Sequence, residues 1–349
     1  MTDGSPMFIT ADEAWLNGWR GASVFEVRGA SLVYVAPLAG WRGAGEIVHL
    51  AGTILPGFRD SHVHLGLIDG DALIPGGISR VVDLGWEPNE ASRWVERASD
   101  RLEVAIVGGL LTAAGGYPSR SSWAPEGSCR EISTPDEGAS ALEEMKRFGA
   151  SMIKIALNSD AGPVWSDDLL AFVVGRARAL ALPVVAHAQG TGQALRAARA
   201  GVDALAHTPW TERLGDDDIA EMVQSCSWIS TLDIHGWGAY GRDHDFAVDN
   251  LRRFAAGGGR VIYGTDLGNG PLPVGINRGE IDGLVMAGLD LDAVVASLTP
   301  GSDATPGSDA SGYGGRFSFI PGPRPTVADD VPGWTASVES LAAPDLFRN

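Results

Sequence analysis

Short apolar runs alternate with helical segments along most of the 349-residue chain. Each run spans about four to eight residues, and most are followed by a stretch in which apolar residues recur with helical spacing. The runs are at residues 53–58, 78–84, 103–110, 151–157, 183–187, 203–206, 227–234 and 261–265. Continuously apolar strands that alternate with helices form parallel sheets covered by helices, and eight such units close a barrel. The pattern therefore predicts an α/β protein with a (β/α)8 (TIM) barrel.

The sequence outside these runs has a different pattern. Runs of β type separated by Gly-rich turns at residues 22–55 predict a small antiparallel sheet ahead of the barrel. The hexapeptide Thr-Pro-Gly-Ser-Asp-Ala occurs twice over residues 299–310, and we interpret it as a flexible surface connection. We predict three parts. Residues 1–52 form the N-terminal part of a small β-domain, and residues 53–298 form the barrel. Residues 299–349 form a linker and the C-terminal part of the β-domain.

Composition and charge exclude several classes of partner. Hydrophobic residues make up 44% of the chain, with 47 Gly and 20 Pro, which is typical of a globular protein with many tight connections. The 26 basic and 44 acidic residues give a net charge of −18, which repels nucleic acid and anionic membrane surfaces. The cysteines, Cys129 and Cys226, lack metal-type spacing, so neither a disulfide framework nor a zinc knuckle is indicated. With no signal sequence and no run of about 18 apolar residues, we expect a cytoplasmic protein.

Chemically reactive side chains lie at the ends of five of the eight runs. The active site of a (β/α)8 barrel is built at the C-terminal ends of its strands, so these positions are the place to look for chemistry. The first run leads into His62 and His64, whose i, i+2 spacing in a strand directs both imidazoles to one face. The candidates are His62, His64, Lys154, His187, His207 and Asp266. Four of the seven histidines and one acid thus fall at one end of the predicted barrel, which indicates a metal site.

Lys154 is the most informative of these residues. The chain has 24 arginines but two lysines, Lys146 and Lys154. An unpaired ammonium inside an apolar strand is costly to bury, so a lysine there indicates chemistry that a guanidinium cannot perform. Addition of carbon dioxide to the amine is one such reaction, and the resulting carbamate can bridge two cations. The alternative is a lysine with a buried stem and an ammonium that reaches the barrel rim beside an acid.

The segment Pro56-Gly57-Phe58-Arg59-Asp60-Ser61-His62-Val63-His64 resembles the first-strand signature of the amidohydrolase superfamily, and the other candidates match its remaining ligand positions in order. The resemblance covers residues 22–298. Within the superfamily, Gly264-Thr265-Asp266 and the run from Gly201 to His207 are similar to imidazolonepropionase-like and prolidase-like hydrolases. Such relatives usually finish with strands that complete the small β-domain, whereas this chain is turn-rich there. We therefore expect a reduced β-domain.

The resemblance implies a binuclear metal centre in which a carboxylated lysine bridges two divalent ions. The implied ligands are His62, His64 and Asp266 on the more buried ion, His187 and His207 on the other, and carboxylated Lys154 between them. Imidazole and carboxylate ligands suit zinc, which we expect, although manganese, iron or cobalt could occupy the same set. With a bridging hydroxide the centre keeps a charge of about +1, which holds hydroxide at neutral pH and polarises a carbonyl. We expect this hydroxide to attack an amide carbonyl, while Asp266 passes its proton to the leaving nitrogen.

Three functions are compatible with this site. The first is binuclear metal-dependent hydrolysis of an amide, cyclic amide or dipeptide-like C–N bond in a small molecule. The second keeps the centre but deaminates its substrate or hydrolyses a lactone or ester. The third is a non-catalytic barrel that acts as a scaffold. Lys154 favours the first over deamination, because mononuclear deaminases of the superfamily do not need this lysine, and retention of all six ligands argues against a scaffold.

The loops that follow the strands are rich in aromatic residues, which could sandwich an apolar or cyclic acyl group. They carry Trp86, Tyr117, Arg120, Trp123, Trp210, His235, Trp237, Tyr240 and Arg278. The candidate substrate contacts are Tyr117, His235, Trp210 and Tyr240, each of which could instead be a packing residue. His244 is expected at the surface. The sequence leaves assembly into a homo-oligomer open.

Overall fold

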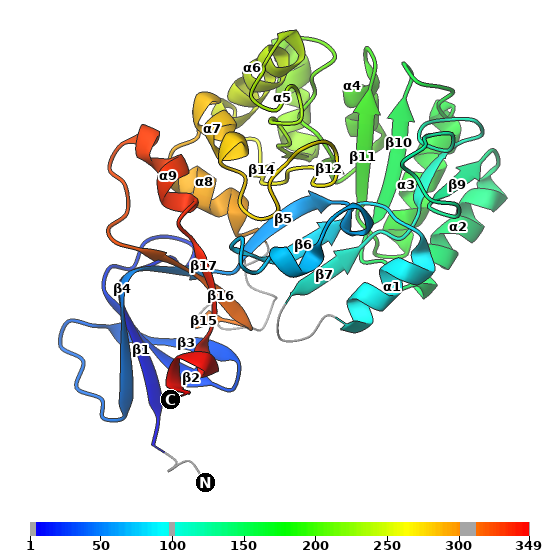
Figure 1. Ribbon diagram of the computed structural model, residues 1–349. Coiled ribbons are helices and arrows are strands. Elements are labelled where there is room, and N and C mark those ends of the chain that lie inside the picture. Colours follow the sequence, from blue (N-terminus) through cyan, green and yellow to red (C-terminus); the bar gives the residue numbers. More distant parts are fainter. Residues whose placement is uncertain (1–4, 98–101, 301–311, 349) are drawn as a thin grey trace.

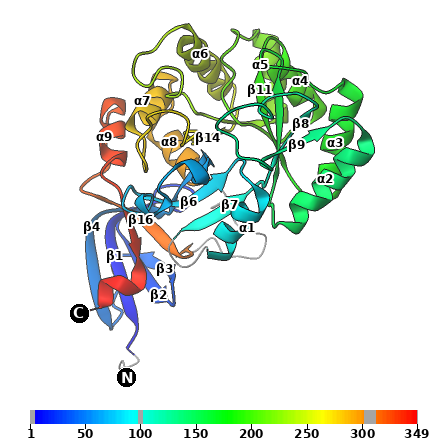
Figure 2. The ribbon, with the colours of Figure 1, turned by 45° about the vertical axis from the view of Figure 1, so that its right-hand side comes forward.

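The chain folds into a barrel with helices on its outside and a second β-sheet to one side (Figure 1). This computed structural model describes residues 5–97, 102–300 and 312–348, so the predicted connection lies outside the described residues except at 299 and 300. The second sheet lies at the lower left in Figure 1, close to both ends of the chain. Figure 2, turned by 45°, shows the same arrangement of the two parts.

The barrel is built from parallel strands in two sheets, ordered β5-β6-β7 and β14-β13-β12-β11-β10-β8-β9. Their bounds are β5 Phe58–Val63, β6 Ile78–Asp83, β7 Glu103–Ile106, β8 Leu110–Ala113, β9 Cys129–Ile132, β10 Ile153–Asn158, β11 Val184–Gln189, β12 Ala204–Leu205, β13 Ser227–Ile229 and β14 Val261–Ile262. Hydrogen bonds join the sheets at both seams. The Ser61 N–H donates to the Tyr263 carbonyl (3.1 Å), and the Ser151 N–H donates to the Ile106 carbonyl (3.0 Å). Within the described ranges, these bonds close a ring of eight strands, β5, β6, β7 and β10 to β14, while β8 and β9 pair beside β10. The predicted (β/α)8 barrel is confirmed.

Helices cover the outer surface of the barrel (Figures 1 and 2). Their bounds are α1 Pro88–Arg97, α2 Pro135–Arg147, α3 Asp167–Ala179, α4 Gln193–Ala200, α5 Asp216–Ser225, α6 Arg242–Ala256, α7 Arg278–Met286 and α8 Leu291–Leu298. Local sequence sets several of their ends. The Ser166 side chain accepts the Leu169 N–H at the start of α3, and Gly201, in the left-handed region with φ 86°, ends α4.

The second sheet uses both ends of the chain and has the order β15-β3-β2-β1-β4-β16-β17. Its strands are β1 Met7–Ala14, β2 Ser23–Arg28, β3 Ser31–Pro37, β4 Glu46–Pro56, β15 Gly312–Tyr313, β16 Arg316–Pro321 and β17 Glu339–Ala342. Strand β1, which the sequence pattern did not reveal, pairs antiparallel with β2 but parallel with β4. The small antiparallel sheet predicted at residues 22–55 is therefore correct for β2 and β3 but not for β4, whose partner from the N-terminal part is the parallel strand β1. The C-terminal segment, expected to be reduced, contributes β15, β16 and β17, and the short helix α9 (Val331–Thr335) packs against α7.

The first apolar run is divided between the two sheets. Strand β4 continues to Pro56 in the second sheet, where it pairs with β16, and the barrel strand β5 begins at Phe58. Gly57 lies between them, and a Cβ there would come 2.3 Å from the Ser79 Oγ. The strand predicted at residues 53–58 therefore ends at the residue where the barrel strand begins. The error arises because a continuous apolar run does not show where the chain passes from one sheet to the next.

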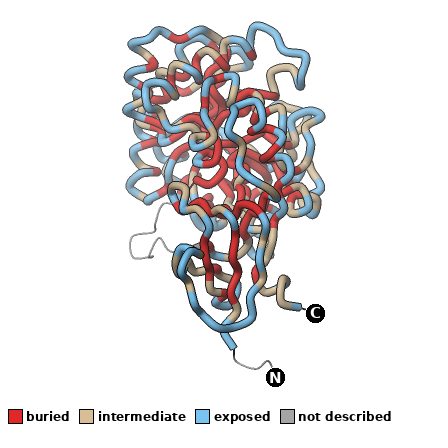
Figure 3. Tube along the Cα trace, turned by 90° about the vertical axis from the view of Figure 1, so that its left-hand side faces the viewer, coloured by how far each residue is buried: buried red, intermediate tan, exposed pale blue. Residues whose placement is uncertain are grey.

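Buried residues fill the barrel and one face of the second sheet (Figure 3). The rings of Trp228 in β13 and Phe254 in α6 stack with centroids 3.9 Å apart, which holds α6 against the barrel. The second sheet has its own core around Phe25, Tyr313 and Phe317. Within the described ranges, the structure has no helix of the length and apolarity that crossing a membrane requires.

Two loops of the barrel meet backbone to backbone at Gly76, before β6, and Gly275, before α7. The Ile276 N–H donates to the Gly76 carbonyl at 2.8 Å. A Cβ on Gly76 would lie 2.6 Å from both the Gly275 Cα and the Val274 carbonyl oxygen. Since backbone atoms cannot rotate away as a side chain can, this contact requires glycine.

Replacing Gly76 with Ala is expected to lower the free energy of unfolding by about 2 kcal/mol, because the two loops would have to separate. Gly175→Ala in α3 is the matched control, since Gly175 is exposed and a Cβ there meets nothing within 4 Å. The control should raise the free energy of unfolding by up to about 1 kcal/mol. Urea unfolding measures both changes, and a stabilising Gly76→Ala would show that the loops do not need this close approach.

Candidate metal centre

The six predicted ligands lie on or soon after strands of the barrel, at one end of it. In chain order they are His62 in β5, His64 directly after β5, Lys154 in β10, His187 in β11, His207 after β12 and Asp266 after β14. All are buried, and all line one cavity of about 230 Å³. The structure therefore brings together every residue that the sequence proposed as a ligand.

Three donor groups converge most closely. The Nε2 atoms of His62 and His64 lie 3.0 and 3.2 Å from the Oδ1 atom of Asp266. One ligand atom from each residue lies within 4.8 Å of the other two, a spacing that could hold one metal ion. The other carboxylate oxygen, Asp266 Oδ2, accepts a hydrogen bond from the Asn269 side chain at 2.9 Å. Asn269 thus orients the carboxylate, a contact that no pattern in the sequence indicated.

Hydrogen bonds orient the imidazoles of this cluster. His62 Nδ1 lies 2.9 Å from the Ala206 carbonyl oxygen, and His64 Nδ1 lies 3.0 Å from the Gly85 carbonyl oxygen. A carbonyl oxygen can only accept, so each Nδ1 carries the hydrogen, and in the neutral ring the Nε2 lone pair faces the cavity. Support of a ligand imidazole through its second nitrogen is the usual arrangement in metal sites.

The remaining two histidines lie beside this cluster. The His207 ring is 4.7 Å from the His62 ring and 5.0 Å from the His187 ring, measured between centroids. His207 Nδ1 lies 2.9 Å from the Thr231 hydroxyl, which leaves Nε2 for a ligand. In the pairing of β10 with β11, Lys154 is opposite Val185 and Ala156 is opposite His187. Lys154 and His187 therefore point to the same inner face, because strand side chains alternate.

Burial favours the uncharged forms of Lys154, His62 and His187, whereas the Asp266 carboxylate raises the pKa of His64 against the effect of burial. It lowers the pKa of Lys154 to about 7, although the Asp266 and Asp83 carboxylates act in the opposite direction. Burial also lowers the pKa of His62 to about 4 and that of His187 to about 3, with the charge of Lys154 adding to the effect. A neutral imidazole is a metal ligand and a neutral amine is a nucleophile, so burial prepares both for their expected roles.

A buried carboxylate that the sequence analysis did not select holds the first and last barrel strands in place. Asp60 Oδ1 accepts the backbone N–H of His62 (3.0 Å) and that of Thr265 (3.1 Å). Asp266 follows with φ 56°, in the left-handed region that non-glycine residues rarely occupy. Such strained backbone persists where surrounding contacts enforce it, as Asp60 does here. The one sequence signal for Asp60 was its position in the segment from Pro56 to His64, two residues before His62.

Three of the four candidate substrate contacts reach the cavity. Tyr117, Trp210 and His235 line it, together with Trp123 and Trp237 from the same group of loops. Gln189 and Asn269, which the sequence did not single out, also line it. The structure does not bring Tyr240 to this cavity.

Tyr240 is instead 38% exposed, and its hydroxyl reaches a buried polar cluster. Its hydroxyl donates to Asp233 Oδ1 at 2.8 Å, and its ring stacks on His244 with centroids 3.8 Å apart. His244 is 2% exposed, so the expectation that it lies at the surface is wrong, because α6 turns this ring inward. Glu280 accepts the Asp233 N–H at 2.9 Å, and burial raises the pKa of Glu280 to about 7.

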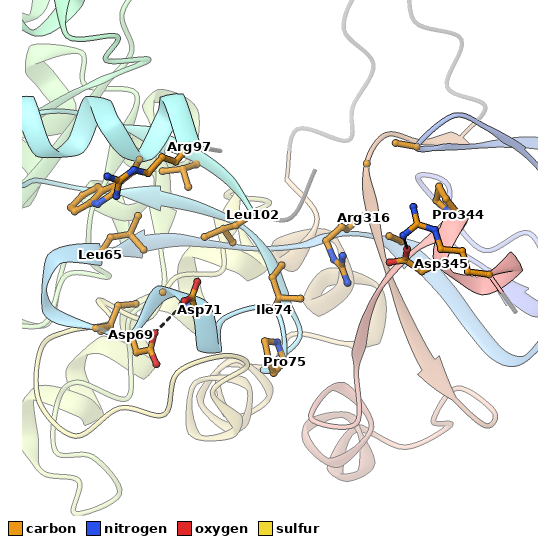
Figure 4. A pocket seen from close by; sticks show the side chains of 18 residues that line it. Leu65, Asp69, Asp71, Ile74, Pro75, Arg97, Leu102, Arg316, Pro344 and Asp345 are labelled. Atoms are coloured by element: carbon orange, nitrogen blue, oxygen red, sulfur yellow. Dashed lines mark hydrogen bonds and ion pairs between the residues drawn. The ribbon is translucent and has the colours of Figure 1, made fainter. Parts of the chain in front are cut away.

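A larger cavity, of about 1030 Å³, lies between the barrel and the second sheet (Figure 4). Leu65, Arg97 and Leu102 line it from the barrel, and Arg316 and Asp345 face them from the sheet. None of the six predicted ligands lines it. The smaller cavity is therefore the candidate active site, because it holds the convergent donors.

The fold was compared with known proteins. No family model matches the sequence, and no curated protein does either. The chain is similar in structure to an amidohydrolase, with 18% identity over 97% of this chain and 98% of that one and a TM-score of 0.76. It is also similar to a Xaa-Pro dipeptidase solved with bound methionine, with 16% identity, 97% and 98% coverage and a TM-score of 0.75. A third structure, phenylurea hydrolase B, has 16% identity, 97% and 96% coverage and a TM-score of 0.74.

These similarities extend over nearly the whole of each chain, including both sheets. The chain therefore has the fold of the amidohydrolase superfamily, as the first-strand signature led us to expect. Of the two subgroups suggested by Gly264-Thr265-Asp266 and the run from Gly201 to His207, the similar structures are of the prolidase-like form. Because the sequences are less than a quarter identical, the similarity establishes the fold, and the activity has to be argued from the site itself.

The raised pKa of Glu280 predicts a stability that depends on pH. Between about pH 4.5 and 7 the folded protein retains a proton that the unfolded chain has lost, so the free energy of unfolding falls as pH rises through this window. The loss is at most about 3 kcal/mol. Glu280→Gln stays neutral and should flatten this fall. Urea unfolding at pH 5 and pH 8 measures it, with Glu46→Gln at an exposed position as the control. If the free energy of unfolding fell with pH as steeply in Glu280→Gln as in the wild type, the raised pKa assigned to Glu280 would be contradicted.

Proposed function

We propose that this protein is a metal-dependent hydrolase of the amidohydrolase superfamily that cleaves an amide-type C–N bond in a small molecule. The observation that supports it most directly is the cluster of His62, His64 and Asp266, whose ligand atoms lie within 4.8 Å of one another in a buried cavity. Burial of this many imidazoles around one carboxylate has no evident structural purpose, since apolar side chains would fill a barrel better.

The donors suit two divalent ions. His62, His64 and Asp266 would hold one ion, and His187 and His207 would hold the second. Neutral imidazoles with a carboxylate fit zinc, which remains the expected metal. Ions held there would lower the pKa of a bound water and polarise a substrate carbonyl, which is the chemistry that amide hydrolysis needs.

Lys154 would supply the bridging ligand as a carbamate. With its pKa lowered to about 7 by burial, much of the amine is neutral near neutral pH and carries a free lone pair. The Nζ lone pair adds to the carbon of carbon dioxide, one C–O π bond becomes an oxygen anion, and a proton leaves the nitrogen for solvent. The product exchanges a costly buried cation for an anion with two donor oxygens, which two cations would stabilise.

Asp266 would move the proton. Its Oδ1 atom lies between the two imidazoles, and its Oδ2 atom is held by Asn269, so the carboxylate is fixed in position. In this proposal it accepts a proton from the attacking water and delivers it to the leaving nitrogen as the C–N bond breaks.

His235 is the best placed polar contact for the substrate. It lines the cavity, and its Nε2 atom is buried without a hydrogen-bond partner in the described part of the protein. Two of the similar structures are named as a dipeptidase and a phenylurea hydrolase, and both names denote hydrolysis of a bond between a carbonyl carbon and a nitrogen. We propose the same type of bond for the substrate of this protein.

Metal content tests the binuclear site. Zinc-loaded wild type is expected to bind two ions per chain, and Lys154→Gln should lose one of them because the bridging ligand is gone. Lys146→Gln is the matched control, since Lys146 is the other lysine of the chain and is exposed. Elemental analysis after dialysis gives the stoichiometry. A wild type with one ion per chain would contradict the binuclear proposal and favour deaminase-like chemistry.

Asp266→Asn tests the proton transfer. Turnover should fall by about a hundredfold or more, because the amide cannot accept the proton, while most of the metal stays bound. Asp168→Asn, at an exposed position at the start of α3, should leave turnover unchanged. The measurement is the rate of amide hydrolysis beside metal content. Full activity of Asp266→Asn would rule out the assigned role.

A further inference from the structure

We infer that the cavity takes an uncharged amide whose carbonyl is flanked directly by aromatic or branched alkyl groups. This inference rests on the proposed hydrolase function and names its substrate class. A dipeptide with free ends, or any substrate with a carboxylate close to the scissile bond, is excluded by it.

Aromatic side chains begin immediately beside the predicted ligands. The Tyr117 ring lies 5.0 Å from the His187 ring, and the Trp123 ring lies 5.3 Å from the His64 ring, measured between centroids. On a third side, Trp210 lies 5.3 Å from the His207 ring. A carbonyl placed at the imidazoles would therefore have aromatic walls next to both of its substituents, and such walls favour apolar groups.

Within the described ranges, the cavity lining offers no cation for a substrate carboxylate. Its charged side chains, apart from imidazoles, are Lys154 and Asp266, and both are assigned to the metal centre. Arg120, in the loop after β8, and Arg278, the first residue of α7, do not line the cavity. A carboxylate buried without a cation is costly, whereas a neutral amide needs few hydrogen bonds.

The remaining polar groups of the wall suit a neutral ligand. Gln189 and Asn269 are uncharged, and burial lowers the pKa of His235 to about 4, so this ring is neutral as well. The chain's net charge of −18 adds long-range repulsion for an anion. The volume of about 230 Å³ is below the roughly 300–1,000 Å³ of sites for drug-sized ligands, so the substrate is compact.

A matched pair of compounds tests the inference on the zinc-loaded full-length protein. N-isobutylbenzamide and N-benzoyl-L-valine share one skeleton, with a phenyl group on the carbonyl and a branched alkyl group on the nitrogen, and they differ by the carboxylate. The neutral compound should bind at least about tenfold more tightly, as measured by quenching of tryptophan fluorescence, because Trp123, Trp210 and Trp237 line the cavity. If the protein hydrolyses amides as proposed, kcat/KM should favour the neutral compound by a similar factor.

Trp237 allows a matched pair of variants. Its side chain lines the cavity but is 47% exposed, so it is at the mouth. Trp237→Arg adds the missing cation and should raise the affinity for the acid relative to the neutral compound by about tenfold. Trp237→Gln, which is neutral, should leave this ratio unchanged. Any direct contact of the carboxylate with the metals is common to all three proteins and cancels in the comparison.

The outcomes separate this inference from the proposed function. Tighter binding of the neutral compound without hydrolysis of either would support the substrate class and count against the hydrolase proposal. Hydrolysis that favours the acid would overturn the substrate class and leave the hydrolase proposal standing. Equal affinities in the wild type, or no measurable binding of the neutral compound, would overturn the inference directly.

Discussion

The site depends on how the last barrel strand meets the first. The buried Asp60 carboxylate accepts the N–H groups of His62 and Thr265, so one side chain holds the metal-binding segment of β5 and the residue before Asp266. Backbone bonds on the other side of Asp266, from Leu267 N–H to the His62 carbonyl and from His64 N–H to the Leu267 carbonyl, complete the frame that holds its left-handed backbone. Placement of Asp266 Oδ1 within 3.2 Å of two imidazoles is thus a consequence of barrel closure.

Burial then gives the cluster its chemistry. Inside the barrel, charged forms of Lys154 and His187 are disfavoured, and their pKa values fall to about 7 and about 3. Neutral imidazoles and a neutral amine are the forms that bind metal and react with carbon dioxide. The same low polarity extends into the aromatic wall of the cavity, which Tyr117, Trp123 and Trp210 form.

Strand boundaries were harder to predict than strand order. The eight apolar runs gave the barrel correctly, but the first run was assigned as a whole to the barrel although β4 in the second sheet takes most of it. Strand β1 was missed because its mixed sequence, with Asp12 and Glu13 near its end, hides the pattern. Apolar residues tolerate burial in either sheet, and their sequence does not record which strand pairs with which.

The sequence by itself determined the six candidate ligands. Each ends or lies inside an apolar run, and the ends of parallel strands meet at one edge of a barrel whatever the loops do. Only the tertiary structure decided the surroundings of that cluster. It brought Trp123, Trp237 and Asn269 to the cavity, and it left Tyr240 and Arg278 outside. Loop side chains are placed by contacts between residues far apart in the chain, such as the bond from Asn269 to Asp266 or from Tyr240 to Asp233, and no local pattern encodes those contacts.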